Sequence, residues 1–194
     1  MAGPGAACVG GSGLDAPAGG SAAAQTIYLV GNVSQLRTAL NATGRRWIVF
    51  YVSGVYNLGV GGDDADGELE WRNDGRATLI DLSPSPGVII KGGGIPIWGN
   101  TGAGAATRGK DCAMINVRVF DKARNVGLGY AVGTFDDGSV YERICFAYCT
   151  FLYSYDQIVT LVGRTEDCGL FGTIVAKAIR SGVLSMGGLV ERQV

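Results

Sequence analysis

The sequence predicts an all-β fold in which short strands stack as a β-solenoid, with one short helix near the N-terminus. Three observations predict this class. Glycine supplies 33 of the 194 residues, about twice the usual share, which is typical of a chain with many turns. From Ala77 onward, short apolar runs alternate with Gly, Asn, Asp and Ser, and no stretch shows sustained helical periodicity. Three of these apolar runs can also be laid over one another.

The three matching runs are DCAMINVRV from Asp111, RICFAYCTF from Arg143 and DCGLFGTIV from Asp167. Their fourth positions hold Met114, Phe146 and Leu170, and their second, seventh and ninth positions are nearly all apolar as well. Such repeats are what a solenoid requires, because each turn of the chain buries its inward side chains only against the turns next to it. Three strands of a β-sandwich that happen to be apolar remain the alternative.

The N-terminal stretch predicts an arm rather than a folded unit. Residues 1–24 are mostly Gly, Ala, Ser and Pro with almost no large apolar side chain, so they cannot bury a core of their own. We expect this flexible arm to lie along the body of the protein or along a neighbouring molecule. Residues 25–194 are expected to form a single domain, because 47% of the chain is hydrophobic and only 17% is charged.

The first elements of the body alternate between strand and helix. The run Thr26–Val30 predicts a strand. The run NVSQLRTALNATG predicts a helix over Ser34–Thr43, with Ser34 or Asn32 as N-cap and Gly44 as the stop. WIVFYVSGVYNL then predicts two strands separated by a turn at Gly54, and an acidic loop follows.

Charge and the absence of histidine exclude several classes of function. The chain has 16 Lys and Arg against 17 Asp and Glu, so it offers no strongly basic surface and we expect no nucleic-acid partner. Without histidine it cannot carry a Ser-His-Asp or Cys-His site or a His-ligated zinc. The N-terminal stretch has no basic segment followed by an apolar run, so we expect a soluble protein made without an export signal and no membrane partner.

The five cysteines are predicted to be free thiols. Their number is odd, and none stands in the C-x-x-C spacing of a zinc or redox motif. We expect Cys112, Cys145, Cys149 and Cys168 to be free, with at least three of them buried, because a free cysteine in an apolar run behaves as a small hydrophobic residue.

Several motifs, taken in order, resemble the pectate lyases. IYLVGNVSQLRTALNATGRRWIVFYVSGVYNL is similar to the opening of that family, in which a strand leads to an L-R-x-A-L helix and to a strand ending I-V-F-x-V-S-G. SPSPGVIIKGGGIPI, RICFAYCTFLYSYDQIVTLVG and DCGLFGTIVAKAI resemble the stretches that follow in the family. The resemblance covers about Ile27 to Leu189. It implies a right-handed parallel β-helix, closed at its N-terminal end by the short helix.

The residues that carry catalysis in pectate lyases are not matched here. Those enzymes cleave acidic pectin by β-elimination, with calcium held by carboxylates and an arginine as base. Ala147 and Tyr148 stand where the family has Asp and His, and only Asp156 retains the Asp of the next motif. Neither Arg180 nor Arg192 is followed by the proline of the family's Arg-x-Pro tract. The resemblance therefore implies a β-helix without the catalytic residues and without a cofactor.

The first functional hypothesis is a non-catalytic structural or binding protein. The resemblance and the missing export signal favour a virion surface component, such as a phage capsid decoration or spike subunit. We expect a homo-oligomer, a trimer by analogy with other viral β-helices, attached through the arm to a larger assembly such as a capsid. Tyr148, Tyr153 and Tyr155 are the candidate binding face, because tyrosine offers a large contact area at low entropy cost and could also stack on an acidic glycan.

The alternative hypothesis is a calcium-dependent polygalacturonate lyase with a relocated site. In this interpretation Asp136, Asp137 and Asp156 hold calcium, because this cation prefers several carboxylate and carbonyl oxygens. Arg143 or Arg180 then acts as the base that removes the proton beside the uronate carboxyl group.

Overall fold

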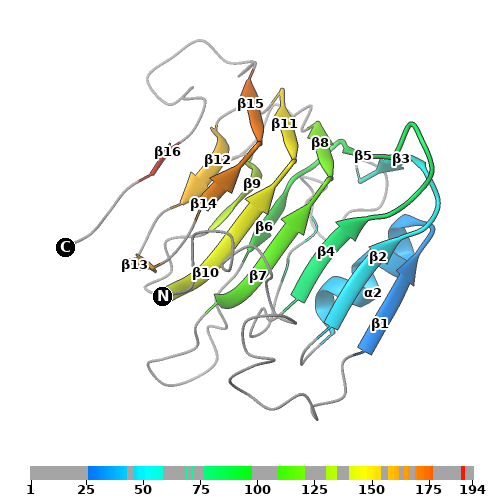
Figure 1. The fold of residues 1–194 in the computed structure, drawn as a ribbon, viewed down its shortest axis with the longest axis horizontal. Coiled ribbons are helices and arrows are strands. Elements are labelled where there is room, and N and C mark those ends of the chain that lie inside the picture. The colour runs from blue at the N-terminus through cyan, green and yellow to red at the C-terminus, as the bar shows by residue number, and fades with distance from the viewer. Residues whose placement is uncertain are drawn as a thin grey trace.

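The computed structural model of the chain consists mostly of strands in parallel sheets, with one helix among the residues it describes (Figure 1). The described residues are 26–42, 46–58, 69, 71, 77–97, 109–120, 130–134, 140–153, 157–161, 164–166, 169–176 and 189–190. The arm predicted for residues 1–24 lies outside this set.

The largest sheet, called sheet A here, has seven strands in the described residues. Its order is β1-β2-β4-β7-β10-β13, and β14 also pairs with β10. All of its pairings are parallel. The strands are β1 (Thr26–Val30), β2 (Arg46–Phe50), β4 (Ala77–Asp81), β7 (Gly109–Ile115), β10 (Val140–Ala147), β13 (Arg164–Glu166) and β14 (Gly169–Phe171).

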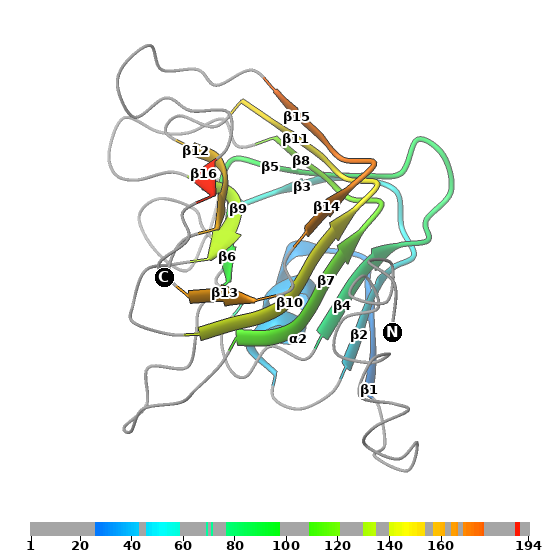
Figure 2. The ribbon, with the colours of Figure 1, turned by 60° about the vertical axis from the view of Figure 1, so that its left-hand side comes forward.

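Two smaller parallel sheets complete the described structure. Sheet B consists of β3 (Gly54–Asn57), β5 (Val88–Lys91), β8 (Arg118–Phe120), β11 (Thr150–Leu152) and β15 (Ile174–Ala176). Sheet C consists of β6 (Ile95–Ile97), β9 (Tyr130–Thr134), β12 (Gln157–Leu161) and β16 (Leu189–Val190). From β4 to β12, successive strands fall in sheets A, B and C in turn, as β7, β8 and β9 do, and Figure 2 shows the three sheets around a shared interior.

The predicted alignment of the apolar runs is confirmed. Phe146 is the register partner of both Met114 and Leu170. One sheet further along the chain, Phe151 is the register partner of Val119 and Val175. The sandwich alternative called for antiparallel sheets, whereas every pair among the described strands is parallel.

The core lies between the sheets as one apolar cluster. It joins Met114 and Phe146 of sheet A to Phe151 of sheet B and Ile158 of sheet C, all buried. The rings of Phe146 and Phe151 meet edge to face with their centroids 5.5 Å apart, a favoured aromatic geometry. Leu170 belongs to the same row but is partly exposed, because β14 has a described partner on one side only.

The predicted helix is present as α2 (Val33–Asn41), beside β1 and β2. Of the two predicted N-caps Asn32 is the one used, since its side chain accepts from the Gln35 backbone N–H at 2.9 Å. The other end is closed by buried Arg46, which donates to the carbonyl oxygens of Ala39 at 2.8 Å and Leu40 at 3.0 Å. The helix ends at Asn41, before the predicted Thr43, because Ala42 is extended; Gly44 lies outside the described residues.

Candidate functional site

The outer face of sheet A is apolar across the width of the sheet. Ile48, Leu79 and Phe146 point into the core, so the residues next to them along each strand point outward. Two rows of register partners make up what we call the apolar outer face. One row is Leu29, Val49, Ile80, Ile115, Ala147 and Phe171, and the other is Ile27, Trp47, Thr78, Ala113, Cys145 and Gly169.

Exposure changes from one side of this face to the other. On edge strand β1, Ile27 is 64% exposed and Leu29 is 59% exposed. On β7 and β10, Ala113 and Cys145 are completely buried and Ala147 almost so. The described side chains that pack around Cys145 all belong to sheet A itself. The outer face is therefore buried at β7 and β10 and open to water at the edge strand β1.

Cys145 is disulfide-bonded, so the prediction that it is a free thiol is wrong. It lies on the outer face of sheet A beside Ala113 and Ala147. Cys112 and Cys149 are free, as predicted. All three are buried, which confirms the expected burial, and Cys8 and Cys168 lie outside the described residues.

Cys149 lies between β10 and β11, where the chain turns from sheet A to sheet B, and it belongs to the core. Its Sγ is 3.3 Å from the carbonyl oxygens of both Met114 and Ala147, and its thiol can donate to one of them at a time. Burial raises the pKa of this thiol to about 11. The thiolate is the reactive form of cysteine, so Cys149 is protonated and inert at neutral pH.

Tyr148 lies at the same turn between β10 and β11, but its side chain is exposed and its backbone conformation is unusual. Asn116, Tyr148 and Gly172 follow β7, β10 and β14 and have φ values of 59°, 55° and 54°. This left-handed conformation suits Gly and Asn but is rare for a bulky residue. A Cβ added at Gly172 would come within 2.9 Å of the Tyr148 ring, so the glycine makes room for it. The ring is 71% exposed.

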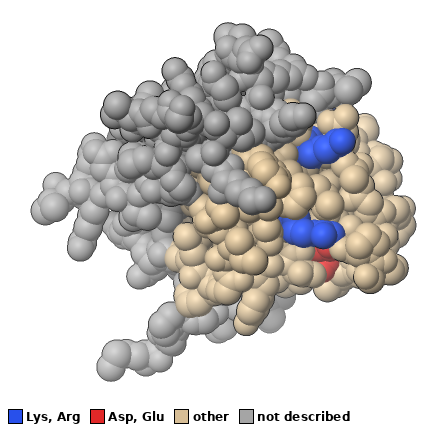
Figure 3. Space-filling view, turned by 90° about the horizontal axis from the view of Figure 1, so that it is seen from above, with Lys and Arg blue, Asp and Glu red and all other residues tan. Residues whose placement is uncertain are grey.

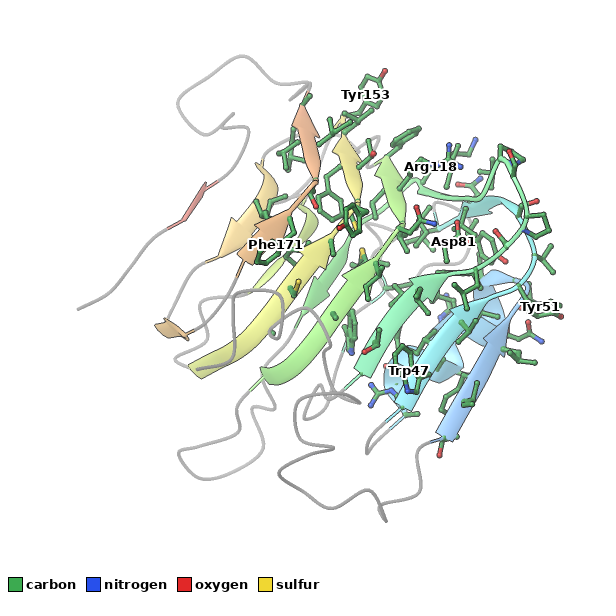
Figure 4. All side chains as sticks on the ribbon, viewed as in Figure 1. Trp47, Tyr51, Asp81, Arg118, Tyr153 and Phe171 are labelled. Atoms are coloured by element: carbon green, nitrogen blue, oxygen red, sulfur yellow. The ribbon has the colours of Figure 1, made fainter. Side chains whose placement is uncertain are left out.

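The other predicted surface tyrosines stand elsewhere. Tyr153 follows the far end of β11, also has a left-handed φ of 65°, and meets Phe120 edge to face at 5.9 Å. The structure thus places Tyr148 and Tyr153 at opposite ends of β11, with Tyr153 labelled in Figure 4. Tyr155 lies outside the described residues.

Asp81 organises the turn that leads from sheet A to sheet B, and the sequence analysis did not single it out. It is buried, with 4% exposure, at the end of β4. Its Oδ1 accepts from the Ser83 backbone N–H at 2.8 Å and from the Ser83 hydroxyl at 2.5 Å, and its Oδ2 accepts from the Val88 N–H at 2.7 Å. The sequence signal was Asp followed two residues later by Ser in a Pro-rich stretch, which is typical of an Asx-turn.

Arg118 holds the same turn from the next strand of sheet B (Figure 4). Its Nε donates to the Val88 carbonyl oxygen at 3.2 Å, and its guanidinium also donates to the Pro86 carbonyl oxygen. A Cβ added at Gly87, where φ is +81°, would lie 2.8 Å from the Asp81 carboxylate. Asp81 and Arg118 therefore shape the turn from its two sides.

An exposed apolar patch lies where the first strands leave sheet A. We call it the corner patch, and it consists of Tyr51, Val52, Val55 and Leu82. Tyr51 and Leu82 follow neighbouring strands of sheet A, since Tyr51 N–H donates to the Val30 carbonyl oxygen and Leu82 N–H donates to that of Phe50. Leu82 is 67% exposed. From above, most of the described surface carries neither acidic nor basic side chains (Figure 3).

Most residues proposed for a lyase site fall where the structure makes no statement. Asp136, Asp137, Asp156 and Arg180 lie outside the described residues, and of Arg143 only the backbone, in β10, is described. Within the described part of the chain, no group of three or more His, Cys, Asp or Glu side chains is placed to hold a metal ion. Nor does that part contain a helix long and apolar enough to cross a membrane.

Comparison with known proteins gives no relative for this chain. No family model, no curated protein and no solved structure matches it.

Proposed function

We propose that the chain is a right-handed parallel β-helix that serves as a non-catalytic structural subunit. The fold proposal is supported by the order of the strands from β4 to β12, which pass from sheet A to sheet B to sheet C and then return to sheet A. It is also supported by the continuous registers, in which like side chains meet from strand to strand. Helix α2, which buries Leu36 and Leu40 against the core, is the cap of the N-terminal end.

The observation that carries the structural role is the exposed apolar surface at the N-terminal edge of the sheets. Ile27 and Leu29 on β1 and the corner patch beside them leave several large side chains in water. An edge strand also has unpaired backbone groups, and natural sheets usually blunt such edges with charge or cover. Large apolar side chains exposed in this number at one edge indicate an interaction site.

The partner that fits this surface is a second copy of the chain, in a homo-oligomer that we propose to be a trimer. The larger assembly is a virion surface, where the protein is a capsid decoration or spike subunit. Burying one leucine side chain contributes on the order of 1.5 to 3 kcal/mol, so a single polar substitution in the patch weakens association about tenfold or more.

The test is the oligomeric state of the full chain and of two variants by sedimentation equilibrium. Leu82→Gln is expected to shift the oligomer towards the monomer by at least tenfold in dissociation constant. Asn57→Gln, an exposed polar change on β3 of the same edge, is the matched control and is expected to leave association unchanged. A wild-type chain that is monomeric at micromolar concentration would overturn the proposal, as would an oligomer that both variants leave intact.

Incubation with polygalacturonate and calcium tests the non-catalytic part of the proposal. We expect no unsaturated uronide product. Turnover that a calcium chelator abolishes would overturn the structural role and favour the lyase alternative with Asp136, Asp137 and Asp156.

A further inference from the structure

Edge strand β1 has backbone groups that no described strand pairs with. It pairs with β2 on one side, and Figure 1 shows no described element beyond it on the other. Tyr51 N–H donates to the Val30 carbonyl oxygen at 3.3 Å, so the backbone groups of Val30 point towards β2. Successive residues of a strand point these groups to opposite sides, so those of Tyr28 also face β2. The N–H and carbonyl groups of Ile27 and Leu29 therefore face the open edge.

The side chains of β1 do not protect this edge. Ile27 and Leu29 are both exposed, on the outer face of sheet A. The strand reads TIYLV and carries no Lys, Glu or Pro, the residues with which natural edge strands prevent pairing. Helix α2 packs on the core side of the sheet and leaves the edge open (Figure 1).

We propose that β1 pairs antiparallel with β1 of a second copy, across a two-fold axis at Tyr28. In this register Ile27 of each copy lies opposite Leu29 of the other. Opposite residues whose backbone groups face each other exchange both N–H···O bonds, so the pair uses every open group of the two residues in both copies. A shift by one residue sets outward groups against inward ones, and a shift by two leaves only one hydrogen-bonded pair within β1.

The same pairing covers the exposed side chains. Opposite residues of an antiparallel pair lie on the same face, so Ile27 of each copy packs beside Leu29 of the other. The inference rests on the proposed function, because the partner is a second copy of the chain. A trimer is closed by a threefold axis, so the two-fold pair joins one proposed trimer to another and leaves the corner patch for contacts within a trimer.

Cysteine cross-linking of the full chain tests the register. Ile27→Cys and Leu29→Cys chains are produced together in one cell, purified and oxidised with glutathione disulfide, and covalent dimers are measured on a non-reducing gel. Opposite residues of a hydrogen-bonded pair have Cα atoms about 5.5 Å apart, which a disulfide spans. Equal positions in the two copies are diagonal neighbours about 7 to 8 Å apart, beyond that reach.

We expect a covalent dimer as the main product when the two variants are produced together. Either variant alone is expected to give only the background of the wild type, which carries the same native cysteines. Equal cross-linking of the variants alone and together overturns the register. No cross-linking in any sample overturns the pairing.

The substitution Ile27→Pro gives a second measurement that adds no cysteine. Proline removes the N–H that faces the open edge and leaves the ladder to β2 complete, because an edge strand accepts proline where its N–H faces solvent. Sedimentation equilibrium should show the β1 contact weakened about tenfold or more, since each copy loses one hydrogen bond. Ile27→Val keeps the N–H and is the matched control, expected to leave the contact unchanged. Association that Ile27→Pro leaves intact overturns the inference.

Failure of this inference can be told from failure of the proposed function. A wild-type chain that is monomeric at micromolar concentration overturns both. An oligomer that gives no cross-link overturns only the pairing at β1. A cross-linked pair whose further association Leu82→Gln leaves unchanged overturns only the role of the corner patch.

Discussion

The replacement Asp81→Asn tests whether one buried carboxylate holds the turn between sheets A and B. Asp81 accepts three hydrogen bonds at 2.5 to 2.8 Å, two from Ser83 and one from Val88. Asparagine has nearly the same shape but only one acceptor oxygen, and its other position is an NH₂ donor. Whichever way the amide turns, it faces at least one backbone N–H donor with another donor.

The expected cost follows from these contacts. A hydrogen bond to a charged acceptor contributes about 1.5 to 3 kcal/mol, and a buried donor left without a partner costs about 1 to 3 kcal/mol. Val88 is completely buried, so water cannot replace the lost acceptor there. We therefore expect Asp81→Asn to lower the free energy of unfolding by about 2 to 4 kcal/mol. Ser83→Ala removes only the hydroxyl donor, whose bond to Asp81 is partly buried, and should cost about 1.5 kcal/mol, the lower end of the same range.

Urea unfolding followed by circular dichroism measures both variants against the wild type. Lys91→Gln, an exposed change on β5, is the control and should stay within about 0.5 kcal/mol of the wild type. The reasoning fails if Asp81→Asn is as stable as the control. It also fails if Ser83→Ala costs as much as Asp81→Asn, because the backbone contacts would then contribute nothing.

Three further substitutions probe the core, the helix and the buried thiol. Phe151→Ala should cost about 3 to 5 kcal/mol in urea unfolding, whereas Ile174→Ala on the exposed edge should cost less than about 1 kcal/mol; equal losses would contradict the proposed row of core side chains. Arg46→Met should cost about 2 to 3 kcal/mol, because it leaves two carbonyl oxygens of α2 without a donor, and unchanged thermal unfolding would show that the cap is dispensable. Burial raises the pKa of Cys149 from 9.0 to about 11, so the unfolded chain loses this proton first. Stability should therefore fall by about 2 kcal/mol as pH rises from 9 to 11, and Cys149→Val should remove that contribution.

The sequence was most informative where side chains repeat. The rows through Phe146 and Phe151 could be predicted because a stacked strand places like residues at like positions, and the parallel pairing follows the predicted columns. Helix α2 could be predicted from its cap and its apolar spacing, but its end could not. That end is set by Arg46, a long-range contact that leaves no local pattern.

The sequence was least informative about which face of a strand is covered. Cys145 was expected to be a free thiol in an apolar run, yet alternation turns it away from Ile144 and Phe146 towards the outer face. A strand that is buried on both faces loses the period of two that would assign its sides. Asp81 was missed for a different reason, since a single acidic residue before a Pro-rich turn has no periodic signal at all.

The apolar outer face gives the proposed association a physical basis. Its rows run from Leu29, which is open to water, to Ala147, which is buried. A sheet that is apolar on both faces is stable in water only where both faces are covered. The edge strand β1 is therefore the part of this face that is left for another molecule.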